Sequence, residues 1–215
     1  MEDVKNFRVV DCEKSNFIKP LKIFYTQNGK DKAWDALKVH DSVVIIIYNS
    51  SRDVLVFVKQ FRPAVYISRV DTIKQDDGSV TIDHTKFPPS LGITYELCAG
   101  IVDKSKPIVE IAQDEVFEEC GYKVPLDRFR RVTGYRSGVG TNGSYQNMFY
   151  IEVTDDMKVS SGGGNPLEGE LIDIVEIPVS EGRKFVMDEA VVKPLGVMFG
   201  IQWFYDNIKP ELKST

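Results

Sequence analysis

The chain has 215 residues, of which 42% are hydrophobic and 27% are charged, and these proportions are ordinary for a folded globular protein. Its net charge of −5 argues against a general nucleic-acid-binding protein, which usually carries a surplus of basic residues on one face. No apolar run approaches the ~20 residues that cross a bilayer. Three cysteines without metal-ligand spacing, and a charged start without a signal peptide, predict a cytoplasmic protein.

The N-terminal part of the chain differs from the rest. Residues 21–27 and 34–39 are short mixed segments that suit strands pairing outside the main core. We therefore predict a strand-rich N-terminal extension at residues 1–40 and a main domain at residues 41–215.

The main domain alternates between strand and helix signals. Periodicity and turn residues predict a hairpin at residues 41–49 and 54–60, further strands at residues 94–99, 129–135, 146–153 and 171–178, and helices at residues 105–120, 184–189 and 195–207. Residues 71–94 are polar and are interpreted as an insertion, and the glycine-rich residues 160–166 as a flexible loop. The predicted fold class is α/β (α+β), with one mixed sheet, a central helix and a terminal helix.

The helix predicted at residues 105–120 carries the most informative pattern. Glu115, Glu118 and Glu119 lie three and four positions apart or side by side, so they crowd one side of the helix. Such carboxylates repel one another without a counterion, and Mg²⁺ takes oxygen ligands, so the row predicts a metal site. A solvated acidic face is the alternative, but the glycine that follows this row favours the metal. The opposite side is predicted to be buried through Ile108, Ile111, Ala112 and Val116.

This segment resembles the Nudix box, Gly-x5-Glu-x7-Arg-Glu-apolar-x-Glu-Glu-x-Gly-apolar. The positions in register are Gly100, Glu115, Val116, Glu118, Glu119, Gly121 and Tyr122. Lys106 stands where the box has Glu and Asp114 where it has Arg, so the charges are exchanged and an attractive pair can still form. The resemblance implies a Nudix fold, in which helices sandwich a mixed sheet. It also implies a Mg²⁺-dependent pyrophosphohydrolase in which Mn²⁺ can replace Mg²⁺.

Further segments extend the resemblance over most of the chain. Residues 59–63 (KQFRP) and 95–100 (YELCAG) are similar to the branch of the Nudix family that acts on ADP-ribose and nucleotide sugars. Residues 40–43 (HDSV), 137–140 (SGVG) and 148–150 (MFY) resemble its UDP-sugar diphosphatases most. The resemblance implies a homodimer, joined through the N-terminal extension, that cleaves UDP-glucose and similar UDP-sugars to UMP and a sugar 1-phosphate. An ADP-ribose pyrophosphatase and a non-catalytic nucleotide-sugar-binding module are the alternatives.

The resemblance also assigns the metal ligands and the catalytic groups. Glu115 and Glu119 are the expected ligands, joined by the backbone carbonyl of Ala99. Glu118 either binds the metal or orients water, so it belongs with Glu119 in the catalytic set. On the later loop, Glu170 is expected to act as the base or to position the attacking water, with Glu168 as the near alternative. The flexible loop at residues 160–165 could let this segment close over the substrate.

Four residues are predicted to bind the substrate. Arg62 ends a strand-like run, where a guanidinium can bind phosphate oxygens in a fork. Arg136 and Ser137 precede a glycine turn that could face phosphate or sugar. Trp34 could stack on a nucleobase in its own site or in a partner's, although most tryptophans are packing residues. Glu96 is expected near the metal without binding it.

Overall fold

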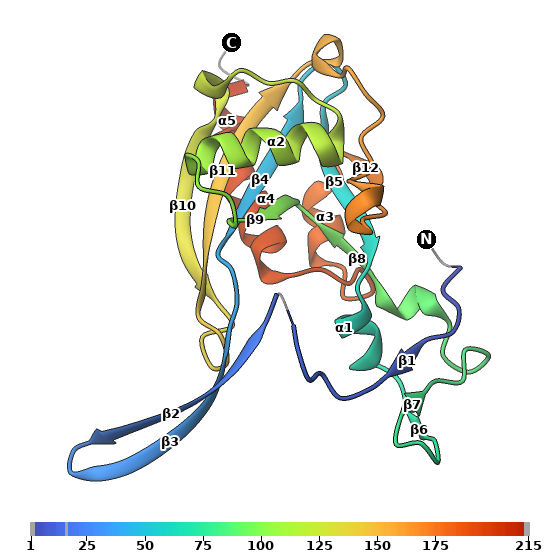
Figure 1. Ribbon diagram of the computed structural model, residues 1–215. Coiled ribbons are helices and arrows are strands. Elements are labelled where there is room, and N and C mark those ends of the chain that lie inside the picture. The colour runs from blue at the N-terminus through green and yellow to red at the C-terminus, as the bar shows by residue number, and fades with distance from the viewer. Residues whose placement is uncertain (1–2, 16, 213–215) are drawn as a thin grey trace.

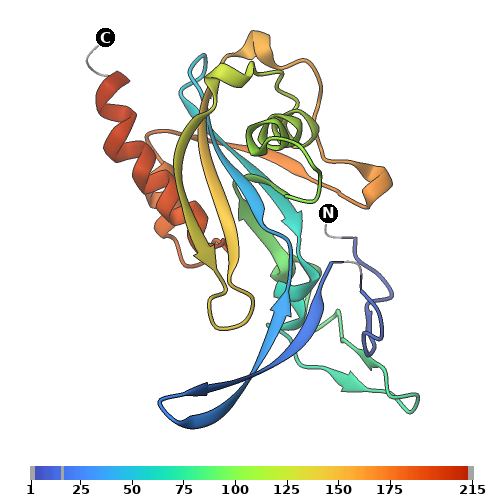
Figure 2. The ribbon, with the colours of Figure 1, turned by 60° about the vertical axis from the view of Figure 1, so that its left-hand side comes forward.

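The computed structural model describes residues 3–15 and 17–212, and its main body is a sheet between two helical layers (Figures 1 and 2). The strands are β1 (Arg8–Val9), β2 (Lys19–Gln27), β3 (Lys30–Lys38), β4 (Ser42–Asn49), β5 (Val54–Phe61), β6 (Ile73–Lys74), β7 (Val80–Thr81), β8 (Ile93–Glu96), β9 (Cys98–Ile101), β10 (Arg130–Ser137), β11 (Ser144–Val153) and β12 (Asp173–Pro178). The α-helices are α1 (Pro63–Ile67), α2 (Ile108–Cys120), α3 (Gly182–Met187), α4 (Leu195–Asn207) and α5 (Lys209–Leu212). Among the described residues, no helix has the length and apolar character needed to cross a membrane.

Seven strands form the central sheet. Five of them lie in the order β10, β11, β4, β5 and β12, while β8 pairs with β5 and β9 pairs with β4. The β11–β4 pair is parallel and the other pairs are antiparallel. Helix α2 covers one face and helices α3 and α4 cover the other, as Figure 2 shows. The predicted mixed sheet between helices is confirmed.

Strand β4 lies at the centre of the fold and is buried on both faces. Val43, Ile45 and Ile47 pack in the core beneath α2. Val44 and Ile46 pack in the second core, beneath α3 and α4. Successive side chains of a strand point to opposite faces, so a strand between two helical layers needs a continuous apolar run.

The two central strands diverge, and this divergence shapes the site. Strands β4 and β5 pair only near the turn that joins them, and further along β9 pairs with β4 while β8 pairs with β5. The chain changes partner at Leu97, so the single strand predicted at residues 94–99 is in fact two. This change of partner places Glu96 and Ala99 between the diverging strands.

Helix α2 carries the predicted pattern with one exception. It ends at Gly121, whose φ of 75° forms the left-handed cap expected there. Ile111, Ala112 and Val116 are buried against the sheet, as predicted. Ile108 is instead 37% exposed, because it is the first residue of the helix and lies at its open end.

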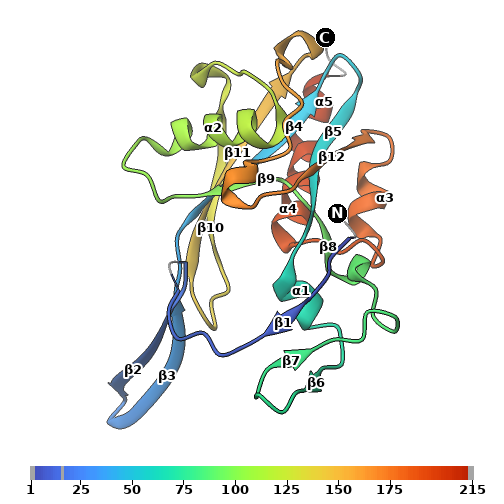
Figure 3. The same ribbon diagram turned by 45° about the vertical axis from the view of Figure 1, so that its right-hand side comes forward.

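Strands β2 and β3 form a two-stranded arm that extends away from the sheet (Figure 3). Every residue of β2 is exposed, and among them Ile23 and Phe24 are large and apolar. The strands predicted at residues 21–27 and 34–39 lie in this arm. Its role between subunits stays a prediction.

The insertion predicted at residues 71–94 contains the short hairpin β6–β7, which pairs with β1. Phe7 ties this small sheet to the main body, because its ring packs edge-on against Tyr66 with centroids 5.2 Å apart. The Tyr66 hydroxyl lies 2.9 Å from Nδ1 of His84, and the two rings stack. His84 thus helps to hold Tyr66 in place.

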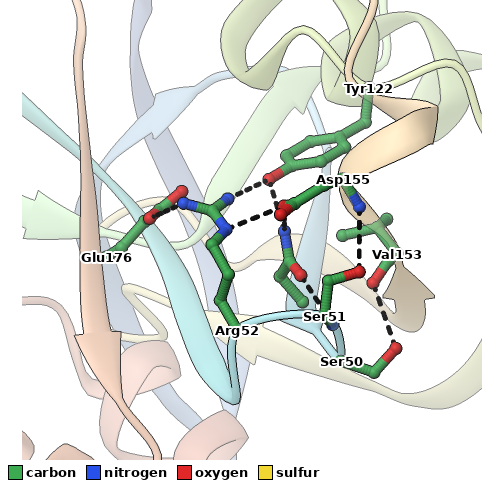
Figure 4. Close-up of polar contacts among 8 residues, drawn as sticks. Ser50, Ser51, Arg52, Tyr122, Val153, Asp155 and Glu176 are labelled. Carbon is green, nitrogen blue, oxygen red and sulfur yellow. Dashed lines mark hydrogen bonds and ion pairs between the residues drawn. The ribbon is translucent and has the colours of Figure 1, made fainter.

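A polar cluster fixes the end of β4 that lies away from the diverging strands (Figure 4). Arg52 donates to Asp155 at 2.7 Å, to the Tyr122 hydroxyl at 3.3 Å and to Glu176. Asn49 donates to Asp155 at 2.8 Å and to Tyr122 at 3.2 Å. Because Tyr122 follows α2 directly, the cluster fastens the C-terminal end of this helix to the sheet.

Candidate active site

A cavity of about 1000 Å³ opens where the central strands diverge. Its wall combines the glutamate face of α2, the residues near the break between β8 and β9, the end of β10 and the N-terminus of α4. Eight of the nine predicted site residues line it, namely Arg62, Ala99, Glu115, Glu118, Glu119, Arg136, Ser137 and Glu170. The fold therefore brings together residues that are up to 108 positions apart in the chain, from Arg62 to Glu170.

Glu119 is the most deeply buried of these groups. Glu119 is only 3% exposed, and the backbone N–H of Ala99 donates a hydrogen bond to its Oε2 at 3.0 Å. Burial, together with the nearby charges of Glu115 and Glu170, raises the pKa of Glu119 to about 8, although hydrogen bonds from Ala99 and Cys98 act in the opposite direction. A cation beside this carboxylate would offset both the burial of its charge and its repulsion by Glu115 and Glu170.

Glu115 lies against the backbone of Gly100. A Cβ atom built on Gly100 would stand 2.0 Å from Oε1 of Glu115, so only glycine leaves room for the carboxylate here. Glu118, on the same helix, also lines the cavity and is partly exposed. Gly100 on β9 and Glu115 on α2 are therefore closely packed against each other.

The donor set fits a hard divalent cation in chemistry and in charge. Three carboxylates from α2 line the cavity, and Mg²⁺ prefers oxygen ligands and retains several waters. Across the described parts of the chain, no three His, Cys, Asp or Glu side chains converge closely enough to form a preassembled metal site. The charges of Glu115 and Glu170 both disfavour the ionised form of Glu119, so a cation between them would be attracted to all three.

The exchanged pair of the Nudix box forms an ion pair. Lys106 Nζ contacts Asp114 Oδ2, and both side chains are partly buried, with exposures of 27% and 35%. The attractive pair considered from the sequence is thus confirmed. It joins the loop after β9 to helix α2.

Arg62 is held by a carboxylate at the cavity wall. Its Nε and Nη2 donate to the two oxygens of Glu96, each at 2.8 Å, and the Thr94 hydroxyl donates to Glu96 at 2.6 Å. Burial would raise the pKa of Glu96, but the hydrogen bonds and charge of Arg62 outweigh it and hold this pKa below its usual range. Glu96 thereby fixes the orientation of the guanidinium.

Glu170 reaches the cavity on a loop that is fastened to α2. The backbone N–H groups of Gly163 and Gly164 donate to the carbonyls of Glu119 and Glu118, at 2.9 and 3.1 Å. The Asn165 N–H then donates to Oε2 of Glu170 at 3.1 Å. The loop predicted to be flexible is docked on the helix C-terminus in this structure. The side chain of Glu168, the alternative to Glu170, lies outside the described parts.

The residues of β10 and of the arm occupy different places. Arg136 and Ser137 line the cavity at the end of β10, and Arg136 donates to the Gly143 carbonyl at 3.0 Å. Trp34 lies on β3, outside the cavity lining, and its Nε1 donates to the Gly140 carbonyl at 2.9 Å. Stacking of Trp34 on a nucleobase in a partner's site stays a prediction.

Several cavity residues were not singled out from the sequence. They include Phe17, Gln60, Lys104, Tyr135 and Leu195. For Gln60 a signal was present, because it precedes Arg62 by two positions, and residues two apart in a strand share a face. Phe17 and Leu195 reach the cavity only through the tertiary fold, so no local pattern marks them.

Comparison with known proteins gives close relatives over the full length. The chain is 46% identical over 221 aligned positions to uridine diphosphate glucose pyrophosphatase NUDT14 of Bos taurus, covering 99% of both chains. It is 41% identical to the protein of the same name from Mus musculus, again over 99% of both chains. GDP-mannose pyrophosphatase of Salmonella typhimurium is 30% identical over 68% of this chain and 64% of its own length. No family model matches the chain. The full-length identity, together with the glutamate face of α2, shows that the chain belongs to the Nudix family of nucleotide-sugar pyrophosphatases.

Proposed function

We propose that this protein hydrolyses the pyrophosphate bond of UDP-sugars, with UDP-glucose as the leading substrate, to give UMP and a sugar 1-phosphate. The observation that carries the proposal is the row of Glu115, Glu118 and Glu119 on one wall of a cavity large enough for a nucleotide sugar. Two full-length relatives named as uridine diphosphate glucose pyrophosphatases favour the UDP-sugar over other substrates.

In this proposal Glu115, Glu119 and the Ala99 carbonyl hold Mg²⁺, and Glu118 binds it or orients its water. When bound, the metal polarises the phosphoryl oxygens and lowers the pKa of a bound water, and Mn²⁺ can supply the same chemistry. The buried position of Glu119 supports its assignment, because an isolated carboxylate there is costly without a positive charge.

The chain's own residues then orient the substrate and move the proton. Glu170 is assigned to accept the proton of the attacking water, and its position in the lining of the same cavity as the α2 glutamates supports this role. Arg62 uses two of its five N–H groups on Glu96, which leaves the others to bind phosphate oxygens. Arg136 and Ser137, which line the cavity at the end of β10, are assigned to the distal part of the substrate.

The experiment that tests this function compares substrates and metal dependence. Hydrolysis of UDP-glucose, ADP-ribose and GDP-mannose is measured with Mg²⁺, with and without EDTA, and the products are separated as nucleoside monophosphate and sugar phosphate. We expect the highest kcat/KM for UDP-glucose and no turnover in EDTA. A preference for ADP-ribose or GDP-mannose would keep the chemistry and correct the substrate.

The glutamate face is tested by two matched substitutions on one helix. Glu119→Gln is expected to lower kcat by about 10²-fold or more, since even groups that only support a metal ligand cost about 10–100-fold. Glu110→Gln is the control, because Glu110 lies in the first turn of α2 and outside the cavity lining, and it should retain activity. Tight binding of UDP-glucose without any turnover in the wild type would identify a binding module instead.

We also propose that the protein acts as a cytoplasmic homodimer joined through the β2–β3 arm. The exposed apolar residues of the arm support the dimer, and among them Phe24 is 76% exposed. Three free cysteines support a reducing compartment, since an oxidising one would put the exposed thiol of Cys12 at risk.

A further inference from the structure

The loop between β10 and β11, residues 138–143, forms part of the substrate cavity and is here called the tip loop. Gly138 and Val139 line the cavity next to Arg136 and Ser137. The position of the tip loop therefore decides where one wall of the cavity stands. Val139 is 80% exposed, so hydrophobic packing does not hold this wall in place.

The tip loop is rigid within itself. The backbone N–H groups of Thr141, Asn142 and Gly143 all converge on the Gly138 carbonyl, at 2.8, 2.8 and 3.1 Å. Asn142 Oδ1 also accepts the Ser144 N–H at 2.9 Å. These bonds fix the shape of the loop, and the Ser137–Ser144 pair together with the Arg136–Gly143 hydrogen bond attaches it to β10 and β11.

Two contacts from the arm hold the loop from another side. Trp34 Nε1 donates to the Gly140 carbonyl at 2.9 Å, and the Leu37 N–H donates to the Thr141 carbonyl at 2.7 Å. Both donors lie on β3. Leu37 stands opposite Pro20 across the arm, and its N–H points outward from β3 to the tip loop.

We propose that Trp34 is a positioning residue for substrate binding: its indole N–H holds the tip loop so that Gly138 and Val139 keep their place in the cavity wall beside Arg136 and Ser137. The proposal rests on the function proposed above and adds how the arm acts in it. Trp34 lines no part of the cavity of its own chain, so within that chain its effect passes through Gly140 and the loop. The arm thereby sets the geometry of one substrate-binding wall.

This role makes a different demand on the side chain from stacking on a nucleobase. Stacking needs an aromatic ring, which phenylalanine supplies. Anchoring needs the indole N–H, which phenylalanine lacks. Trp34→Phe and Trp34→Ala therefore separate the two roles. The chain has two tryptophans, and Trp203, which lies on α4 and packs on Tyr150, provides the matched control Trp203→Phe.

The first test is steady-state kinetics with UDP-glucose and Mg²⁺. We expect KM to rise about 2- to 10-fold in both Trp34→Phe and Trp34→Ala, the range that loss of one hydrogen bond produces. The kcat should stay within about twofold of wild type, because the α2 glutamates and Glu170 belong to elements other than the tip loop. Trp203→Phe should leave KM unchanged. A wild-type KM in Trp34→Phe with a raised KM in Trp34→Ala would overturn anchoring in favour of stacking, and a fall in kcat alone would overturn it too.

The second test does not require turnover, so it stays informative if the protein proves to have another substrate. Hydrogen–deuterium exchange of residues 138–143 is compared in full-length wild type, Trp34→Phe and Trp203→Phe. Loss of the anchor should speed exchange of these amides in Trp34→Phe alone. Exchange that matches wild type would refute the anchor even in an active enzyme.

Discussion

The ion pair between Lys106 and Asp114 shows how a single exchange of charges can preserve a motif. It joins the loop after β9 to helix α2, which carries the glutamates. Both residues depart from the family pattern, but they do so together, and the attraction between the loop and the helix is kept. Charge complementarity, rather than the identity of either residue, is the requirement at this pair.

Reversing one member of this pair should weaken the protein, and restoring complementarity should rescue it. Lys106→Glu places a carboxylate beside Asp114, and we expect a loss of about 1 kcal/mol in the free energy of unfolding, together with lower kcat/KM. The double variant Lys106→Glu/Asp114→Arg, which carries the usual family residues, should regain most of both. Denaturant unfolding of wild type, Lys106→Glu, Asp114→Arg and the double variant gives the coupling energy, and strictly additive effects would mean that the pair contributes nothing.

At the scale of elements, the glycine-rich segment fastens the proposed catalytic base to the metal-binding helix. Residues 162–164 dock on the C-terminal end of α2, and Glu170 folds back against them. A Cβ atom on Gly164 would lie 2.8 Å from Cβ of Glu170 and 3.1 Å from its Oε2. On Gly169, which has nearly the same φ, a Cβ atom would meet nothing within 4 Å.

Two alanine substitutions distinguish the effect of backbone strain from the effect of displacing Glu170, the proposed base. Gly164→Ala and Gly169→Ala both force alanine into the left-handed region, at φ of 81° and 80°, so each should cost about 1–2 kcal/mol in stability. Only Gly164→Ala also pushes Glu170 aside, and we expect it to lower kcat by about 10-fold or more while Gly169→Ala stays near wild type. Equal kcat values at equal stability would show that Glu170 is not held by this contact.

Elements with local signals were predictable, whereas features that depend on tertiary contacts were not. The helix bearing Glu115 and Glu119 and its cap at Gly121 followed from spacing alone. The break at Leu97 did not, because a change of strand partner leaves no mark on an apolar run. The docking of residues 162–164 was also not predicted. A run of glycines indicates a flexible backbone, but it does not show which carbonyl groups that backbone will bind in the fold.

At the scale of the whole molecule, the β2–β3 arm is the part whose exposed apolar surface is not covered by contacts within one chain. It pairs with no other strand of the described chain, and β2 is exposed along its whole length. An isolated two-stranded hairpin is marginally stable in water, and contiguous apolar surface usually marks an interface. The arm also orients the tip loop, so a contact that steadies the arm would steady the substrate cavity as well.

We therefore expect a homodimer in solution whose interface includes Ile23 and Phe24. Analytical ultracentrifugation at micromolar concentrations should give twice the chain mass of 24.3 kDa. Phe24→Asp introduces a charge on the exposed face of the arm and should shift the protein toward monomer, with a raised KM for UDP-glucose because the arm no longer steadies the tip loop. Met187→Asp is the matched control, since Met187 is 67% exposed at the end of α3 and should leave both mass and KM unchanged. A wild type that is monomeric at these concentrations would mean that the arm is stable alone and that its exposed residues serve another contact.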